Sequence, residues 1–160
     1  MGTYDVAQIC ENGHVITDQL RSYPEQGKSF CDRCGAPTLS QCRQCAAEIP
    51  GHYEREWAIA AAWYVRPRFC RGCGGPYPWT QTAIEEAKKL TALAEKLSQR
   101  ERDQLASDID DLVCDTPRTQ GAILRLKLLA PKLGTEVWGA MKVILVNVAT
   151  EVVKKELGIG

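Results

Sequence analysis

Four short pairs of potential metal ligands in the first half of the chain constrain its fold more than any other feature. Three have the form Cys-x-x-Cys, and the fourth is a Cys and a His separated by three residues. Two residues between thiolates allow one tight turn to direct both sulfurs at a single ion. Eight ligands make two tetrahedral sites, so we predict two zinc ions per chain. The ligands are Cys10, His14, Cys31, Cys34, Cys42, Cys45, Cys70 and Cys73.

A structural metal accounts for these cysteines better than the alternatives. Gly13, Gly35 and Gly74 lie inside or directly after three of the pairs, where a tight turn needs a positive φ. No apolar signal segment opens the chain, so we expect a cytoplasmic protein, in which disulfides are rare. No βαβ pattern surrounds any pair, which disfavours a thioredoxin-like site. Iron is an alternative for an all-cysteine site, whereas histidine favours zinc at the other.

The pairs can combine in three ways. Sequential pairing places 10–14 and 31–34 on one ion and 42–45 and 70–73 on the other, and each site is then a zinc ribbon with two knuckles. A RING-like cross-brace would interleave the pairs, but the seven residues between Cys34 and Cys42 do not suit it. The third arrangement joins 31–34 and 42–45 in one short ribbon. We favour the sequential order.

Few residues remain that could form a catalytic site. His52 follows a Pro-Gly turn signal and is assigned to a loop, and Cys114 stands alone and is assigned to the core. The chain therefore offers no Ser–His–Asp or Cys–His set, and it has no Gly-rich phosphate loop. Eight ligands for two ions leave no open coordination position of the kind that a catalytic zinc needs. We predict that the protein is not an enzyme.

Arginines and aromatic residues gather around the last cysteine pair. Arg66, Arg68 and Arg71 flank Cys70, where they would offset the charge of thiolate-bound zinc. With the nearby aromatics they could instead contact single-stranded nucleic acid or an acidic partner. The chain has 20 basic and 20 acidic residues, so the overall field of a nucleic-acid-binding protein is missing. We expect core packing for most of these aromatics: Tyr53, Trp57, Trp63, Tyr64, Phe69, Tyr77 and Trp79.

A change of composition near Trp79 divides the chain. Residues 1–79 hold most of the Gly, Pro, aromatic and Cys residues, whereas residues 80–160 are rich in Leu, Ala, Val, Glu and Lys. We predict an α+β protein, with a small β-rich double zinc ribbon over 1–79 and a C-terminal bundle of about four helices over 80–160. No run of about 18 apolar residues occurs, so no membrane span is expected.

Capping signals place the helix starts. Residues 76–79 are expected to be extended, because a residue before proline avoids the α region. Capping boxes that begin at Thr82 and Ser98 would start the first two helices. Thr116 followed by Pro117 has the form of a cap with Pro at the first helical position, and would start the third.

The last predicted helix is apolar on almost all sides, and such a helix must be buried on almost all sides. Either the other three helices surround it, or it joins a copy of itself and makes a homo-oligomer. Its first apolar stripe is Val137, Met141, Ile144, Leu145, Val148 and Val152, and its second is Val143, Val146 and Val153.

Four strings of the sequence together resemble an uncharacterised bacterial family, a domain of unknown function with double zinc-ribbon character. In chain order they are CENGH, FCDRCGAPT, CRQC and PRFCRGCGGPYPWT. The resemblance covers the ribbons through Thr80 and, more loosely, the helical tail. It implies metal binding by the eight ligands named above, and it brings no known activity.

The sequence therefore favours a zinc-stabilised, non-enzymatic binding or adaptor module that engages a protein partner. One alternative is a nucleic-acid-binding regulator that uses Arg66, Arg68, Arg71 and the aromatic residues of the second ribbon. Another is a redox- or zinc-responsive switch, in which one labile site releases its metal on oxidation.

Overall fold

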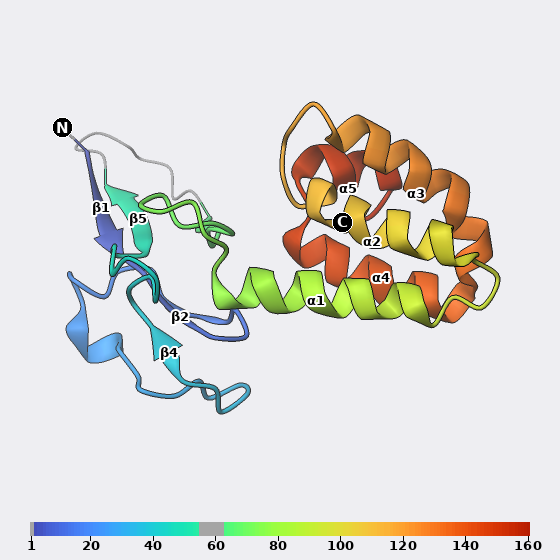
Figure 1. Ribbon diagram of the computed structural model, residues 1–160. Coiled ribbons are helices and arrows are strands. Elements are labelled where there is room, and N and C mark those ends of the chain that lie inside the picture. The colour runs from blue at the N-terminus through green and yellow to red at the C-terminus, as the bar shows by residue number, and fades with distance from the viewer. Residues whose placement is uncertain (1, 55–62) are drawn as a thin grey trace. The chain divides into compact units, whose positions relative to one another are not determined.

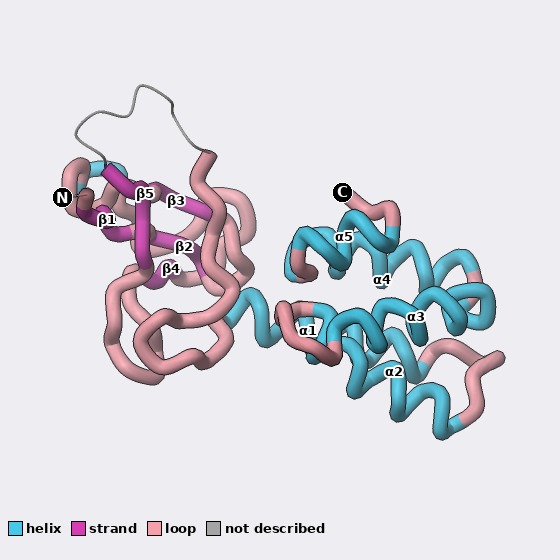
Figure 2. The backbone as a smooth tube through the Cα atoms, turned by 90° about the horizontal axis from the view of Figure 1, so that it is seen from above, coloured by secondary structure: helices cyan, strands magenta, loops and turns pink. Residues whose placement is uncertain are grey.

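The chain has an α+β fold, with short antiparallel strands followed by helices (Figures 1 and 2). The computed structural model describes residues 2–54 and 63–160, so Trp57 lies outside the described residues. The chain forms two compact units, Met1–Gln81 and Thr82–Gly160.

Two small antiparallel sheets form the regular part of the first unit. β1 (Thr3–Val6) pairs with β5 (Pro50–Glu54), and β2 (Gln8–Cys10) lies between β3 (Val15–Thr17) and β4 (Thr38–Leu39). A single 3-10 turn follows at Pro24–Gln26. Loops make up most of the rest of this unit (Figure 2). Strands this short form few ladder hydrogen bonds, so the sheets alone cannot hold the unit together.

The core of the first unit includes metal ligands. Its aromatic part is a stacked pair, Tyr77 on Trp79, with ring centroids 4.7 Å apart. The indole Nε1 of Trp79 donates to the Pro67 carbonyl at 2.9 Å. Two of the predicted ligands are therefore packed among apolar side chains in one cluster, whose buried members are Ala7, Ile9, Cys42, Ile49, Cys70, Tyr77 and Trp79.

The first helix begins earlier than the sequence predicts. α1 spans Pro78–Ala92, so the prediction of an extended segment through Trp79 and a start at Thr82 is wrong. Proline fits the first position of a helix because that N–H has no intrahelical partner. The Tyr77 carbonyl accepts the N–H groups of Thr80 and Gln81, which continues the helix from Pro78.

The next two helices follow the predicted order with one shifted start. α2 (Gln99–Leu112) begins at the predicted capping box, which is confirmed because Ser98 accepts the Glu101 N–H and Glu101 accepts the Ser98 N–H. α3 (Thr119–Leu133) begins after the predicted Thr116 cap. The Thr116 hydroxyl accepts the Arg118 N–H at 3.3 Å and its carbonyl accepts the Thr119 N–H, so Thr116 caps a turn that precedes the helix.

The predicted last helix divides in two. α4 (Thr135–Val148) ends where Ala149 becomes extended, and α5 (Glu151–Leu157) starts at Thr150, whose side chain accepts the Val153 N–H. The described part of the chain therefore has five helices rather than about four. Among the described residues, no helix combines the length and apolar character needed to cross a membrane.

The apolar residues of α4 are buried on one side only. Met141, Leu145 and Val148 are buried at helical spacing, whereas the Val143 side chain is 66% exposed. The prediction of a helix buried on almost all sides is wrong for the single chain. Homo-oligomerisation through this part of the chain stays a prediction.

An ion pair between a buried carboxylate and a partly exposed guanidinium links α2 to α3. Asp108 is 1% exposed, and its two carboxylate oxygens accept bonds of 2.8 and 2.7 Å from the Arg125 guanidinium. Gln104 donates to the same carboxylate at 3.0 Å. A bidentate pair of this kind fixes two helices in both distance and rotation.

Arg125→Met should lower the free energy of unfolding of the helical unit by about 2 kcal/mol, because it leaves the Asp108 carboxylate buried without its charge partner. Lys88→Met is the matched control, since Lys88 pairs with Asp110 where both side chains are exposed. The control should change stability by less than about 1 kcal/mol. Urea titration followed by circular dichroism measures both, and equal effects would contradict a special role for the pair with the buried Asp108.

Candidate metal centres

The three Cys-x-x-Cys pairs share one backbone turn. In each, the N–H of the first cysteine donates to the carbonyl five residues later, and the N–H that follows the second cysteine donates to the carbonyl of the first. The N···O distances are 2.8–2.9 Å in all three turns. An isolated β-bridge closes the base of each turn, between Phe30 and Pro37, Gln41 and Glu48, and Phe69 and Pro76.

The residue after the second cysteine has a left-handed backbone in every turn. Two of these residues are glycines, Gly35 at φ 70° and Gly74 at φ 74°, and the third is Ala46 at φ 58°. No other non-glycine residue in the described part of the chain has positive φ. The left-handed region costs an L-residue about 1–2 kcal/mol, so the 42–45 knuckle is the strained member of the three.

The pair of Cys10 and His14 forms a different turn at the end of β2. The Cys10 N–H donates to the His14 carbonyl at 3.0 Å, and the His14 N–H donates to the Cys10 sulfur at 3.2 Å. Gly13 has φ 85°, and a Cβ there would meet the Arg66 side chain and Trp79. The Arg66 guanidinium donates to the Gly13 carbonyl and so supports the turn.

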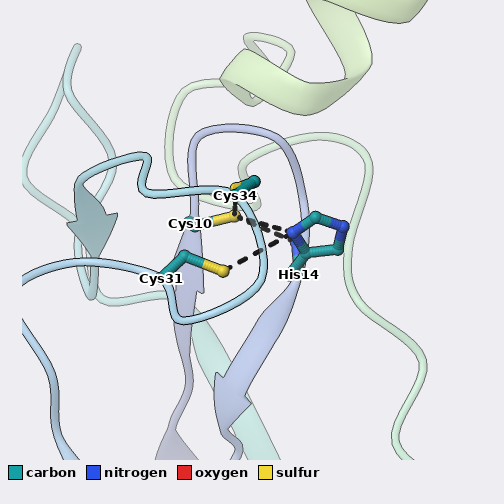
Figure 3. A group of neighbouring side chains, drawn as sticks. All are labelled: Cys10, His14, Cys31 and Cys34. Atoms are coloured by element: carbon teal, nitrogen blue, oxygen red, sulfur yellow. Dashed lines mark hydrogen bonds between the residues drawn. The ribbon is translucent and has the colours of Figure 1, made fainter.

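The first cluster brings together Cys10, His14, Cys31 and Cys34, whose ligand atoms all lie within 4.8 Å of one another. The His14 Nδ1 lies 3.6 Å from the Cys10 sulfur and 3.5 Å from the Cys31 sulfur, and it faces the sulfurs in Figure 3. The sulfurs of Cys10 and Cys34 are 3.7 Å apart. Tetrahedral ligands at about 2.3 Å from an ion are separated by about 3.8 Å, so the cluster fits a metal of that size.

The second cluster brings together Cys42, Cys45, Cys70 and Cys73, also with all ligand atoms within 4.8 Å. Its Cys42–Cys73 and Cys45–Cys70 sulfur distances are 3.8 and 3.6 Å. In each Cys-x-x-Cys turn of the two clusters the first cysteine is buried and the second is exposed. Each centre therefore lies at the surface with one side toward the core. These groups correspond to sequential pairing of the four ligand pairs.

Backbone N–H groups prepare some thiols to lose their protons. The Ala36 N–H, with the Asn12 side chain, lowers the pKa of Cys34 to about 6. Burial alone would raise the pKa of Cys70, but the backbone N–H groups of Cys73 and Gly72 outweigh this effect and lower the pKa to about 6. Each cluster thus offers a thiolate near neutral pH, and the thiolate is the form that binds metal.

Other thiols in the clusters hold their protons more strongly. The Ala47 N–H favours the Cys45 thiolate, but desolvation and the neighbouring thiols raise the pKa of Cys45 to about 12. Desolvation also raises the pKa of Cys10. A bound cation would remove these protons, so metal binding at both centres must release protons and must weaken as the pH falls.

The three arginines named as candidate contacts lie in different settings. Arg66 supports the Cys10–His14 turn, and desolvation lowers its pKa. The Arg68 carbonyl accepts the Tyr77 N–H at 3.0 Å. The Arg71 guanidinium lies 4.7 Å from the ring centroid of Tyr4. At least two of the three guanidinium groups are thus engaged within the unit.

One ion pair links the two clusters directly. Arg43, inside the 42–45 knuckle, pairs with Glu11, inside the Cys10–His14 turn. Ligand spacing alone does not predict this pair, because the two residues are 32 positions apart and neither is itself a ligand. His52 and Cys114 lie outside both clusters, and the His52 Nδ1 is 3.7 Å from the Asp18 carboxylate.

A comparison with protein families matches residues 3–157 to the family described as "Uncharacterized protein conserved in bacteria (DUF2321)". The match spans both units, so the ribbons and the helices belong to one family architecture. Neither the curated proteins nor the solved structures include a match to the chain.

Removing one ligand should remove one metal only. Cys31→Ser should leave the metal of the second centre, Cys42→Ser should leave that of the first, and the wild-type chain should carry two. Cys114→Ser is the control, because its thiol belongs to neither cluster, and it should retain both metals. Native mass spectrometry counts the ions. Loss of both metals from each single variant would contradict two separate centres.

Ala46→Gly should stabilise the metal-loaded first unit by about 1 kcal/mol, because glycine adopts the left-handed backbone without the Cβ clash. The reverse change, Gly74→Ala, should destabilise it by about as much, since a Cβ at Gly74 meets no atom within 4 Å and only the backbone conformation opposes it. Thermal unfolding at saturating zinc measures both. Changes of the same sign would contradict the strain at Ala46.

Proposed function

The chain belongs to this family of uncharacterised bacterial proteins, and we propose that it is a zinc-stabilised, non-enzymatic module that binds a protein partner through its first unit. The observation that carries the proposal is the combination of two complete four-ligand clusters with large apolar side chains exposed on the same unit. The clusters supply a rigid support, and the exposed side chains supply the contact surface.

The ligand sets support zinc in a structural role. Three cysteines with one histidine, and four cysteines, are both common sets for structural zinc. A tetrahedral ion takes four ligands, and the chain provides all four in each cluster, which leaves no position for a substrate or an activated water. Histidine favours zinc over an iron–sulfur cluster at the first centre.

The most exposed of the large apolar side chains in the first unit are Trp63, Val65 and Phe30, at 95%, 83% and 63%. The prediction of core packing is therefore wrong for Trp63. Tryptophan is the residue most often found at the energetic centre of a protein interface, because it buries a large area with few rotatable bonds. These side chains lose unfavourable contact with water when a partner covers them.

The charge distribution supports a protein partner over nucleic acid. The formal net charge is zero, so no long-range attraction draws the chain to phosphate. Arg66 is held against the Gly13 carbonyl and Arg71 lies against the ring of Tyr4, so these two guanidinium groups already have partners. A nucleic-acid surface needs such groups directed outward along a continuous path.

The proposal is tested by photocrosslinking followed by affinity measurement. A photoreactive phenylalanine analogue at position 63 should capture the partner in cells, and the partner is then purified separately. Trp63→Ala should weaken its binding by at least about 30-fold, which corresponds to the loss of an interface hot spot of 2 kcal/mol. Leu128→Ala, which removes an exposed apolar side chain of the second unit, is the matched control and should change the Kd by less than about threefold.

Two outcomes would overturn the proposal. If the purified partner bound wild type and Trp63→Ala equally, the first-unit surface would be wrong. If no protein were captured and single-stranded RNA or DNA bound with an affinity that fell steeply with salt, the nucleic-acid alternative would replace it.

A further inference from the structure

The Tyr77 hydroxyl is buried and has no hydrogen-bond partner among the described residues. Tyr77 is 1% exposed and belongs to the core cluster that contains Cys42 and Cys70. An unpaired buried hydroxyl costs about 1–3 kcal/mol, and a phenylalanine would fill the same space without that cost. A hydroxyl at this position therefore points to a role beyond packing, and the buried cluster around it contains two thiols that could accept its hydrogen bond.

We infer that the Tyr77 hydroxyl donates a hydrogen bond to the Cys70 thiolate when the second cluster binds its metal, and so acts as a positioning residue for that ligand. A metal-bound sulfur keeps its negative charge and its lone pairs, so it accepts hydrogen bonds well. The inference rests on metal binding by the second cluster, which is part of the proposed function.

Both the ring and the backbone of Tyr77 are held in place, which limits the directions in which its hydroxyl can point. Its ring stacks on Trp79 at 4.7 Å with an interplanar angle of 16°, and the indole is fixed by its bond to the Pro67 carbonyl. Its backbone N–H donates to the Arg68 carbonyl. A hydroxyl fixed in this way loses little conformational entropy when it forms one more hydrogen bond.

The position of Tyr77 agrees with this bond. Tyr77 directly follows Pro76, whose bridge to Phe69 closes the 70–73 turn, and it shares the buried cluster with Cys70. A phenol keeps its proton at neutral pH, so the hydroxyl can donate to the Cys70 sulfur. The Gly72 N–H already donates to the same sulfur at 3.3 Å, so Tyr77 would add a second donor.

The first centre has a side-chain donor of its own. The Asn12 amide donates to the Cys34 sulfur at 3.4 Å, on the exposed side of the cluster. Tyr77 would play the corresponding role for the second centre from the buried side. Donors around a metal ligand change metal affinity by about 10- to 100-fold, so the effect of Tyr77 is within reach of measurement.

The test is metal release from the full-length chain, resolved by centre. EDTA is added to the zinc-loaded protein, free thiols are pulse-alkylated, and peptide mapping reports each cysteine. Tyr77→Phe should accelerate labelling of the four cysteines of the second centre by about 10-fold and leave the first centre unchanged. Tyr64→Phe is the matched control, because it removes a hydroxyl that donates to the Pro50 carbonyl at 2.8 Å rather than to a thiolate. It should leave both rates unchanged.

Several results would overturn the inference. An unchanged rate at the second centre would do so, as would equal acceleration at both centres or an equal effect of Tyr64→Phe. If Tyr77→Phe does not fold, the wild-type chain loaded with cadmium-113 decides: a scalar coupling between the metal and the Tyr77 hydroxyl proton is expected, and its absence contradicts the bond. Native mass spectrometry, carried out first, tests metal binding by the second centre separately. If that centre held no metal, the proposed function would be refuted rather than the hydrogen bond from Tyr77.

Discussion

Metal coordination by two groups of four side chains is the interaction on which the first unit depends. Its strands have two to five residues, and its buried cluster has seven members, two of which are ligands. A core of this size supplies only a few kcal/mol, which is less than the conformational entropy of ordering so many loop residues. Zinc–thiolate bonds can supply the difference, because a preformed site does not exist in the unfolded chain and the binding free energy becomes folding free energy. The ligands lie where the strands stop: β2 ends at Cys10, and β4 lies between the 31–34 and 42–45 knuckles. The sheets are therefore best understood as connections between metal-binding turns.

The residues between and beside the ligands hold these turns to one another. Glu11 and Arg43 join a turn of the first cluster to a turn of the second, Arg66 supports the backbone at Gly13, and Arg71 lies on Tyr4 of β1. Each cluster carries negative charge when its thiolates bind zinc, so cations inside the knuckles reduce the repulsion between the two centres. Arginine suits this role because it remains charged when it is partly buried. Two of the three arginines that suggest nucleic-acid binding in the sequence, Arg66 and Arg71, thus have a structural explanation, which is why we propose recognition through the exposed apolar side chains.

The sequence predicts the features that depend on local residue spacing. It misses those in which two local preferences oppose each other or in which a side chain depends on its tertiary surroundings. Cys-x-x-Cys spacing is a local geometric requirement, and the structure groups the ligands in the sequential order that the spacing favours. The capping box at Ser98 is equally local, and it forms. The sequence does not predict the division of the last helix at Ala149, because the apolar pattern continues without interruption past the cap at Thr150. The left-handed Ala46 was missed because glycine marks this position in the other two knuckles. Tyr77 was assigned to the core on its aromatic ring alone, since sequence cannot show that a hydroxyl will be buried without a partner.

The two units draw on different sources of stability, and this difference has a consequence for partner binding. The second unit buries its own apolar residues and the Asp108 carboxylate that pairs with Arg125, and none of its residues belongs to either metal cluster. The first unit should lose its structure when protons or a chelator remove the metal, whereas the second should not. If the partner binds the folded first unit, as we propose, then metal and partner must raise each other's affinity by the same factor, because the coupling between two ligands is reciprocal. Partner binding would then slow metal loss, and metal loss would release the partner. In the proposed module, oxidation of the thiolates would release the metal and with it the partner, so the redox-responsive alternative would be an extension of the binding module rather than a separate function.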